Sequence, residues 1–391
     1  MLAAAGVLAC FGAAFSLPAS AETASPVPVG IPLPLSGDLR SFGIMMKNSF
    51  ELAAEQINRD GGIHGRPLTL VYADDKGERK AAEQAVAELT AAGAVMLVGG
   101  YASDPTYRMA KKADDRDLPF LICTASADKI TQVGLKNVYR LNPPISEYTG
   151  GLEDFFLKDL KPRSMAIVYE DSMFGTNAAT SMMGFCRENA VEIRTLIGYP
   201  REKARPAYMR PLLAPLTADP PDVVYMVSYL EDALVLVKEM QKLKIPSVLC
   251  GGAGGFTQPA FLASAGAAAD GMITAALWSR CSGYPGTEAY YRQYLSRYGS
   301  EPDYHGVEAY SALLVAADAL KRAESFSSRS IRKALDATYR MTPFGPVKFY
   351  TYENFERQNT VRTIVLQVAG GGFRCIWPPD LAEAAFVHPG R

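Results

Sequence analysis

Short apolar runs alternate with longer amphipathic stretches along most of this chain. Val29–Leu33, Leu68–Tyr72 and Val95–Gly99 consist mainly of apolar or β-branched residues, as buried strands do. Between the first two runs, the apolar residues of segment 45–57 recur at helical spacing, and a second helical stretch covers about residues 80–91. The pattern therefore predicts strands and helices in strict alternation.

The same cycle continues further along the chain, through Pro119–Ile122, Met165–Tyr169, Val223–Val227 and Ser247–Leu249. Uninterrupted apolar strands that alternate with helices are typical of parallel sheets covered on both faces. The sequence thus predicts an α/β, doubly wound fold. In such folds ligands bind beyond the carboxyl ends of the strands, so the residues that follow each strand are the candidates for function.

The first residues have the pattern of an export signal. An apolar stretch from Met1 ends in the small residues Ala19-Ser20-Ala21, which predicts a signal peptide and short leader over residues 1–26 with cleavage after Ala21. A lipoprotein-type attachment at Cys10 is the alternative, and the continued apolar run to Leu17 favours ordinary cleavage. No later segment has the roughly 18 uninterrupted apolar residues of a spanning helix. We therefore expect export to the periplasm or the cell exterior.

Charge and metal-binding residues exclude several classes of partner. The formal net charge is −1, the pI is about 6.4 and the charges are scattered along the chain. The sequence therefore does not indicate a basic patch for nucleic acid or for an anionic membrane. The histidines His64, His305 and His388 are too dispersed for a zinc site. We expect neither a metal nor a cofactor, and a small neutral or zwitterionic partner remains open.

The cysteine spacing does not predict a disulfide framework. Apart from Cys10 in the leader they are Cys123, Cys186, Cys250, Cys281 and Cys375, an odd number without a CxxC pair. Most are expected to be buried apolar thiols. A disulfide between Cys250 and Cys281 is one option, because both follow strands that could be neighbours.

Four segments carry a resemblance to a known family. They are PLSGDLRSFG at Pro34–Gly43, the helix end and strand at Ala53–Asp75, LVGGYASDPT at Leu97–Thr106 and YEDSMFG at Tyr169–Gly175. In this order and spacing the chain resembles the periplasmic Leu/Ile/Val-binding family, which has the type I periplasmic-binding-protein fold. The resemblance covers Val27 to about Trp377.

The resemblance implies two Rossmann-like lobes with parallel sheets, joined by three crossovers and closing on a ligand. We expect lobe 1 at residues 27–141 plus 279–357 and lobe 2 at residues 142–278 plus 358–391. It also implies that the protein delivers a small amino-acid-like or carboxylate ligand to the permease subunits of an ABC transporter, and we expect a monomer. A ligand sensor of the same fold, signalling to a membrane or regulatory partner, is the alternative.

Hydroxyl groups follow two predicted strands. Ser103 comes after the strand that ends near Gly99, while Thr124 and Ser126 come after the strand that ends at Ile122. Hydroxyls and free backbone N–H groups at helix starts can form a cradle for a carboxylate. Ser103 and Ser126 could instead be plain N-caps, but the resemblance implies that both positions hold the ligand carboxylate.

Four aromatic residues occupy positions where the family places ligand contacts: Phe42 and Tyr101 from the first lobe, Phe174 and Tyr229 from the second. Aromatic rings exclude water from an apolar ligand body. Core packing is the competing interpretation. It is weaker for Phe42 and Phe174, which we expect in polar loops because each precedes a glycine, and we expect Phe174 and Tyr229 to face an open cleft.

One departure from the family concerns the ligand's amino group. Amino-acid-binding members pair the ligand ammonium with an acid in a second-lobe loop, but here that loop, Cys250–Phe261, has no acid. A buried ammonium without a partner is costly. Glu170, Asp171, Glu231 or Asp232 could replace the acid, although caps or solvated charges are the simpler interpretation. The alternative is a ligand without an amine, such as an amide or an aromatic or aliphatic carboxylate.

The sequence does not indicate an enzyme. The late GGAGGF segment does not match a dinucleotide fingerprint, and there is neither a P-loop lysine motif nor a G-x-S-x-G elbow. His305 stands at a predicted helix start, an unfavourable place from which to recruit a general base. We therefore predict a binding protein without catalytic residues.

Overall fold

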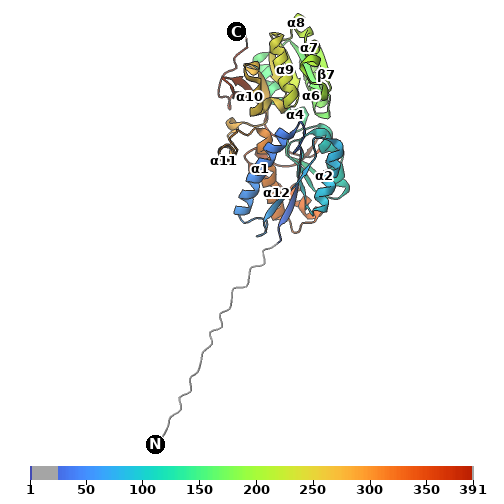
Figure 1. Cartoon of the computed structure of the whole chain (residues 1–391), viewed down its shortest axis with the longest axis vertical. Helices are drawn as coiled ribbons and strands as arrows, with labels where there is room; N and C mark the ends of the chain where they lie inside the picture. Colours follow the sequence, from blue (N-terminus) through green and yellow to red (C-terminus); the bar gives the residue numbers. More distant parts are fainter. Residues whose placement is uncertain (2–24, 390–391) are drawn as a thin grey trace.

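The computed structural model describes Met1 and residues 25–389 of the chain. The expected cleavage after Ala21 and the alternative lipid site at Cys10 lie outside the described residues, as does nearly all of the expected leader. The described chain forms two α/β lobes stacked along the long axis of the molecule (Figure 1). This confirms the predicted two-lobed α/β fold.

The first lobe is built on a seven-stranded sheet with the order β13-β14-β5-β4-β3-β1-β2. All neighbouring strands are parallel except the hairpin formed by β13 and β14. The strands are β1 (Val27–Leu33), β2 (Leu68–Asp74), β3 (Leu97–Gly99), β4 (Phe120–Ile122), β5 (Val138–Arg140), β13 (Tyr350–Tyr352) and β14 (Phe355–Gln358).

The second lobe has a sheet of the same size with the order β16-β15-β10-β9-β8-β6-β7, in which only β15 and β16 run antiparallel to their neighbours. Its strands are β6 (Ser164–Glu170), β7 (Glu192–Tyr199), β8 (Val223–Val227), β9 (Val248–Gly251), β10 (Ile273–Ala276), β15 (Ile364–Ala369) and β16 (Gly372–Trp377). A separate small hairpin joins β11 (Arg340–Thr342) to β12 (Gly345–Val347).

Burial explains the sequence pattern of the strands. In β8 every residue of Val223–Val227 is buried, because helices cover both faces of a central parallel strand. In β7, at the edge of the sheet, exposed and partly buried residues alternate along Glu192–Tyr199. The continuous apolar runs therefore belong to central strands.

Helices follow most strands and cover the sheets (Figure 1). In the first lobe α1 packs on α12 and α2 packs on α3, and in the second lobe α9 packs on α7 and α10. The helices are α1 (Arg40–Arg59), α2 (Arg79–Ala91), α3 (Ser103–Asp115), α4 (Ile145–Tyr148), α5 (Gly150–Phe155), α6 (Met173–Glu188), α7 (Pro206–Leu213), α8 (Pro215–Ala218), α9 (Leu230–Lys242), α10 (Pro259–Ala265), α11 (Thr287–Tyr298), α12 (Tyr304–Arg322) and α13 (Ser328–Asp336).

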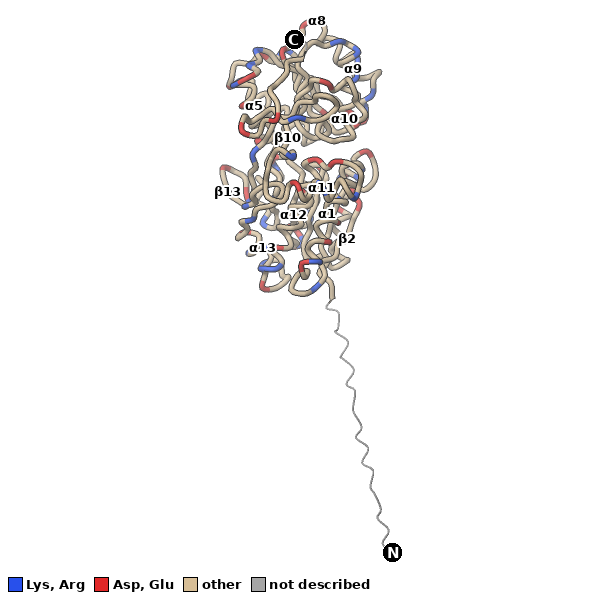
Figure 2. The backbone as a smooth tube through the Cα atoms, turned by 90° about the vertical axis from the view of Figure 1, so that its left-hand side faces the viewer, with Lys and Arg blue, Asp and Glu red and all other residues tan. Residues whose placement is uncertain are grey.

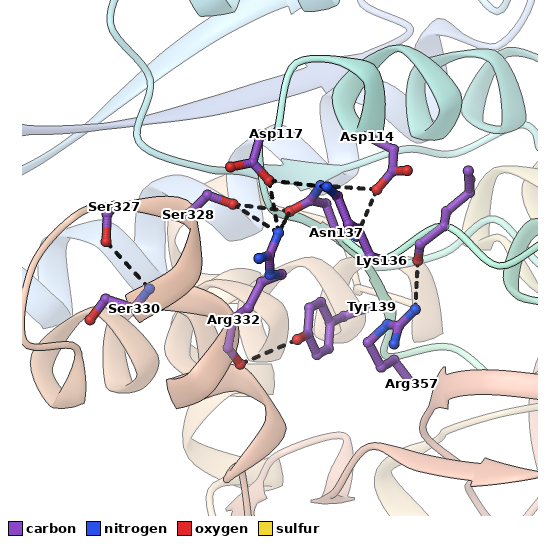
Figure 3. Close-up of polar contacts among 11 residues, drawn as sticks. Asp114, Asp117, Lys136, Asn137, Tyr139, Ser327, Ser328, Ser330, Arg332 and Arg357 are labelled. Carbon is purple, nitrogen blue, oxygen red and sulfur yellow. Dashed lines mark hydrogen bonds and ion pairs between the residues drawn. The ribbon is translucent and has the colours of Figure 1, made fainter.

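The first lobe combines two distant parts of the sequence, and polar contacts fasten them together (Figure 3). Arg332 in α13 donates to Asn137 Oδ1 at 2.6 Å and to Asp117 Oδ1 at 2.8 Å, on the segments that flank β4 and β5. Tyr139 in β5 donates to Asp336 Oδ1 at 2.6 Å. These bonds hold the late helix α13 against strands formed early in the chain.

Three crossings connect the two sheets. The chain passes to the second sheet after β5, returns after β10 and crosses again after β14. Gln358, which the expected division places in lobe 2, pairs with Arg140 of β5 in the first sheet. The exact limits of the two lobes stay a prediction.

The disulfide considered between Cys250 and Cys281 is not present, since both are free thiols. Cys250 is fully buried within β9, whereas Cys281 packs against a different cluster that contains Cys375 of β16. Spatial order in the sheet, which the sequence did not reveal, separates the two thiols.

Lysine and arginine positions are interspersed with acidic positions along the backbone of both lobes (Figure 2). Among the described residues, no helix combines the length and apolarity needed to cross a membrane. Nor do His, Cys, Asp and Glu gather there in a group that could hold a metal ion.

Candidate functional site

A small cavity of about 20 Å³ lies between the closed lobes, beyond the carboxyl ends of the strands. The residues around it come from both lobes, and they provide hydroxyls and aromatic rings. They are Tyr101, Ser103, Thr124, Ser126, Tyr148, Phe174, Tyr229, Gly254, Tyr304 and His305. A larger hollow of about 620 Å³ is lined by residues 159–163 and 220–222, directly before β6 and β8. It lies at the amino ends of the strands, where this fold does not form its ligand sites.

The three predicted cradle residues meet at this cavity. Ser103 is the first residue of α3, and its Oγ accepts a hydrogen bond from the backbone N–H of Ala127 at 3.1 Å. This bond joins the loop after β3 to the loop after β4, which carries Thr124 and Ser126. Ala102 and Ala127, not the two serines, hold the N-cap positions of α3 and of the following short helix at 128–131. The N-cap interpretation of Ser103 and Ser126 is therefore wrong.

The four predicted aromatic residues form one continuous cluster across the two lobes. Phe42 stacks on Tyr101 with ring centroids 4.5 Å apart, Tyr101 lies 5.8 Å from Tyr229, and Tyr229 lies 5.5 Å from Phe174. Tyr101, Phe174 and Tyr229 line the cavity, while Phe42 supports Tyr101 from behind. The structure thus places six of the seven predicted site residues around one cavity and the seventh against it.

Two expectations about these rings are wrong. Phe42 and Phe174 lie in the first turns of α1 and α6, not in polar loops. Phe174 and Tyr229 are 5% and 7% exposed, so they do not face an open cleft. The two lobes are closed on each other, and the rings of one lobe cover those of the other.

The glycine after each phenylalanine has a packing role that is equivalent in the two lobes. A Cβ on Gly43 would lie 1.9 Å from the carbonyl oxygen of Pro34, just after β1, and one on Gly175 would lie 2.0 Å from that of Glu170, at the end of β6. Only glycine permits so close an approach to backbone. Each glycine therefore lets the first helical turn press its ring toward the cavity.

Sequence reasoning missed four lining residues: Tyr148, Gly254, Tyr304 and His305. The signal for the last two was Asp303, a favourable N-cap residue directly before them. Its Oδ1 accepts from the backbone N–H of His305 at 3.0 Å, and its Oδ2 lies 2.8 Å from Nδ1 of the same histidine. The sequence placed His305 at a helix start correctly but weighed it only as a general base.

The acids proposed to replace the missing ammonium partner do not line the cavity. Asp171 and Glu231 are exposed. Glu170 and Asp232 are buried, which raises their pKa values to about 7 and about 6. Both are already engaged inside lobe 2, Glu170 with the Ser172 hydroxyl and Asp232 with the Tyr199 hydroxyl at 2.6 Å.

Another acid, Glu308, lies behind the cradle on α12. Its side chain is fully buried, and within the described part of the chain neither carboxylate oxygen has a hydrogen-bond partner. Burial raises the pKa of Glu308 well above its ordinary value. Burial thus favours the uncharged form of this carboxyl, which repels an anion in the cradle less than a carboxylate does.

Hydrogen bonds across the cavity hold the lobes together. Met173 N–H, at the start of α6, donates to Asp104 Oδ2 at 3.0 Å, and Gly254 N–H donates to the Tyr304 hydroxyl at 3.1 Å. Thr257 Oγ1 also lies 3.2 Å from Asp303 Oδ2. These bonds join the starts of α3 and α12 in the first lobe to the start of α6 and to residues 254–257 in the second, as expected for two lobes that close around a ligand.

The order of elements, the two similar sheets and the cavity between them agree with a match of residues 26–372 to the family described as periplasmic binding protein. The chain belongs to the periplasmic binding protein family. It is also similar to the Leu/Ile/Val-binding protein homolog 7 of Brucella melitensis, with 28% identity over 338 residues, 82% of each chain.

Two solved structures share the fold of this periplasmic binding protein at low sequence identity. A branched-chain amino acid transporter substrate-binding protein from Streptococcus pneumoniae, in complex with isoleucine, superposes with a TM-score of 0.81 and 20% identity over 89% of this chain and 98% of that one. A solute-binding protein of an ABC transporter from R. palustris, in complex with benzoate, gives a TM-score of 0.81 and 20% identity over 90% and 96%. The resemblance inferred from the four sequence segments is confirmed.

Proposed function

We propose that this protein captures a small carboxylate between its lobes outside the cytoplasm and delivers it to the permease of an ABC importer. Membership of the periplasmic binding protein family supports both the binding role and the extracytoplasmic location. The lining of the cavity supports the class of ligand in this proposal.

The observation that carries this proposal is the composition of the cavity. The lining combines the hydroxyls of Ser103, Thr124 and Ser126 with aromatic rings, and none of the described lining residues is acidic. Neutral hydroxyls and helix-start N–H groups suit a carboxylate. An ammonium in the same cavity would lack an ionic partner, which is costly in a buried site. The cavity therefore favours an aromatic or aliphatic carboxylate over an α-amino acid.

A thermal-shift screen of the full chain tests this proposal. Benzoate, hydroxybenzoates, isoleucine and the matching amides are compared, since a ligand at 100 times its Kd adds about 2.7 kcal/mol of apparent stability. We expect the carboxylates without an amine to raise the melting temperature most and their amides to raise it least. Isothermal titration then gives Kd for each hit. Stronger binding of isoleucine than of its deaminated analogue would overturn the ligand class, and no binding at all would overturn the function.

No described feature favours the alternative sensing role, and the proposed partners are the ligand and the permease alone. We propose that the protein acts as a monomer without metal, cofactor or nucleic acid. Size-exclusion chromatography with light scattering, with and without the best carboxylate of the screen, checks the monomer.

A further inference from the structure

His305 is the one imidazole in the cavity lining, and its orientation is fixed from three sides. Its ring stacks on Tyr304 at a centroid distance of 3.8 Å and meets Phe42 and Tyr101 edge to face at 5.0 and 5.4 Å. Only 1% of the residue is exposed. A buried histidine held this firmly presents one defined nitrogen to the cavity.

Asp303 determines which nitrogen that is. Its carboxylate accepts from the backbone N–H of His305 and from the Thr257 hydroxyl, and its Oδ2 lies 2.8 Å from Nδ1. Both oxygens of a carboxylate can only accept hydrogen bonds, so the proton between Asp303 Oδ2 and His305 Nδ1 is carried by Nδ1. In the neutral imidazole Nε2 is then left as a hydrogen-bond acceptor, and Nε2 makes no hydrogen bond with any described residue.

We propose that His305 Nε2 accepts a hydrogen bond from a hydroxyl group of the ligand, and that the ligand is accordingly a hydroxylated aromatic carboxylate. This rests on the proposed function, because the cradle of Ser103, Thr124 and Ser126 must hold the carboxylate of the same molecule. The surrounding rings cover the aromatic body and exclude water from the bond. A buried acceptor discriminates strongly against a ligand that leaves it unpaired.

The experiment measures Kd by isothermal titration on the full chain for benzoate, the ortho-, meta- and para-hydroxybenzoates and the corresponding methoxybenzoates. We expect one hydroxybenzoate to bind about tenfold more tightly than benzoate, the value of one well-formed hydrogen bond. The methoxy compound of the same position cannot donate, so it should gain nothing.

Two substitutions assign the effect to His305. In His305→Phe an aromatic ring remains and the acceptor is removed, so the ratio of the Kd for benzoate to the Kd for the preferred hydroxybenzoate should fall from about ten to about one, whatever the Kd for benzoate itself. In Asp303→Asn the amide oxygen can still cap the His305 N–H, and the amide N–H then faces Nδ1, which moves the imidazole proton to Nε2. That variant should lose the discrimination between hydroxy and methoxy ligands. Melting curves confirm that both variants fold.

The outcomes separate this inference from the proposed function. If benzoate binds but none of the hydroxybenzoates binds more tightly, the proposed role of His305 is wrong. The same holds if His305→Phe keeps the preference for a hydroxybenzoate. In both cases the proposed function as a carboxylate-binding protein is still supported. If no carboxylate in the series binds, the proposed function fails and the inference fails with it.

Discussion

Arg140 donates a hydrogen bond from Nε to Oε1 of Gln358 at 2.6 Å. Arg140 is the last residue of β5 and Gln358 is the last residue of β14, and after each of these strands the chain crosses to the second lobe. Both side chains are fully buried. Gln358 Nε2 in turn donates to the carbonyl oxygen of Asn142, on the other crossing segment. Two of the three connections between the lobes are thus fastened to each other by a buried guanidinium and one amide.

Gln358→Ala should therefore destabilise the protein. Arg140 would keep Ala127 O and Thr131 Oγ1 as acceptors but lose the partner of Nε. Leaving a buried charged donor unpaired costs about 1.5–3 kcal/mol. Urea denaturation measures the change, and Gln84→Ala on the exposed face of α2 is the matched control with less than about 0.5 kcal/mol expected. Equal midpoints for the two variants would show that the buried bond does not stabilise the crossings.

Glu308→Gln should change how stability depends on pH. The pKa of Glu308 is raised in the folded protein, so above its ordinary value near 4.5 the folded state holds a proton that the unfolded chain has released. Folding stability contributed by this group is therefore lost as the pH rises toward the folded pKa, by at most about 1.4 kcal/mol per pH unit for one proton.

The glutamine variant binds no such proton, so its stability relative to the native chain should increase between mildly acidic and mildly alkaline pH. Denaturation of both proteins at several pH values measures this difference, in which the other titrating groups cancel. A difference that does not vary with pH would show that Glu308 is ionised in the folded protein.

Asp104→Ala should shift the protein toward an open form. Asp104 accepts from Met173 N–H across the lobes, so its removal weakens the closed state without changing the ligand contacts. A ligand that needs the closed form then binds with a larger apparent Kd, in proportion to the lost closed fraction. Small-angle scattering without ligand should show a larger radius of gyration than for Asp115→Ala, an exposed control on the same helix. Identical scattering of the two variants would contradict this role.

The sequence predicted the parallel core well because its central strands are continuous apolar runs, as in β8. It also located Ser103, Thr124 and Ser126, since residues that follow parallel strands meet at one edge of the sheet. It did not identify Tyr304 and His305 as lining residues, because α12 follows another helix rather than a strand and its position beside the cavity depends on packing against α1. The buried position of Glu308 depends on the same packing. The antiparallel strands β15 and β16 also lacked the alternation with helices on which the prediction relied.

The last prediction concerns the carboxylate cradle. Ser126→Ala should weaken binding of the best carboxylate by about 0.5–3 kcal/mol, the range for a lost hydrogen bond to a neutral or charged group. Ser103→Ala should do the same and also lower the melting temperature without ligand, because the buried N–H of Ala127 loses its acceptor. Ser296→Ala, exposed on α11, is the control and should change neither quantity.

Comparison of the acid and amide forms of that ligand then separates charge recognition from general packing. In the proposed binding mode the cradle hydroxyls would donate to two carboxylate oxygens, whereas an amide presents one oxygen and one N–H₂ group that is itself a donor. The native protein should therefore prefer the acid, and the double variant Ser103→Ala/Ser126→Ala should lose most of that preference. Titration calorimetry gives both values. Equal affinity of the native protein for acid and amide, or an unchanged Kd in the double variant, would show that the carboxylate is bound elsewhere in the cavity.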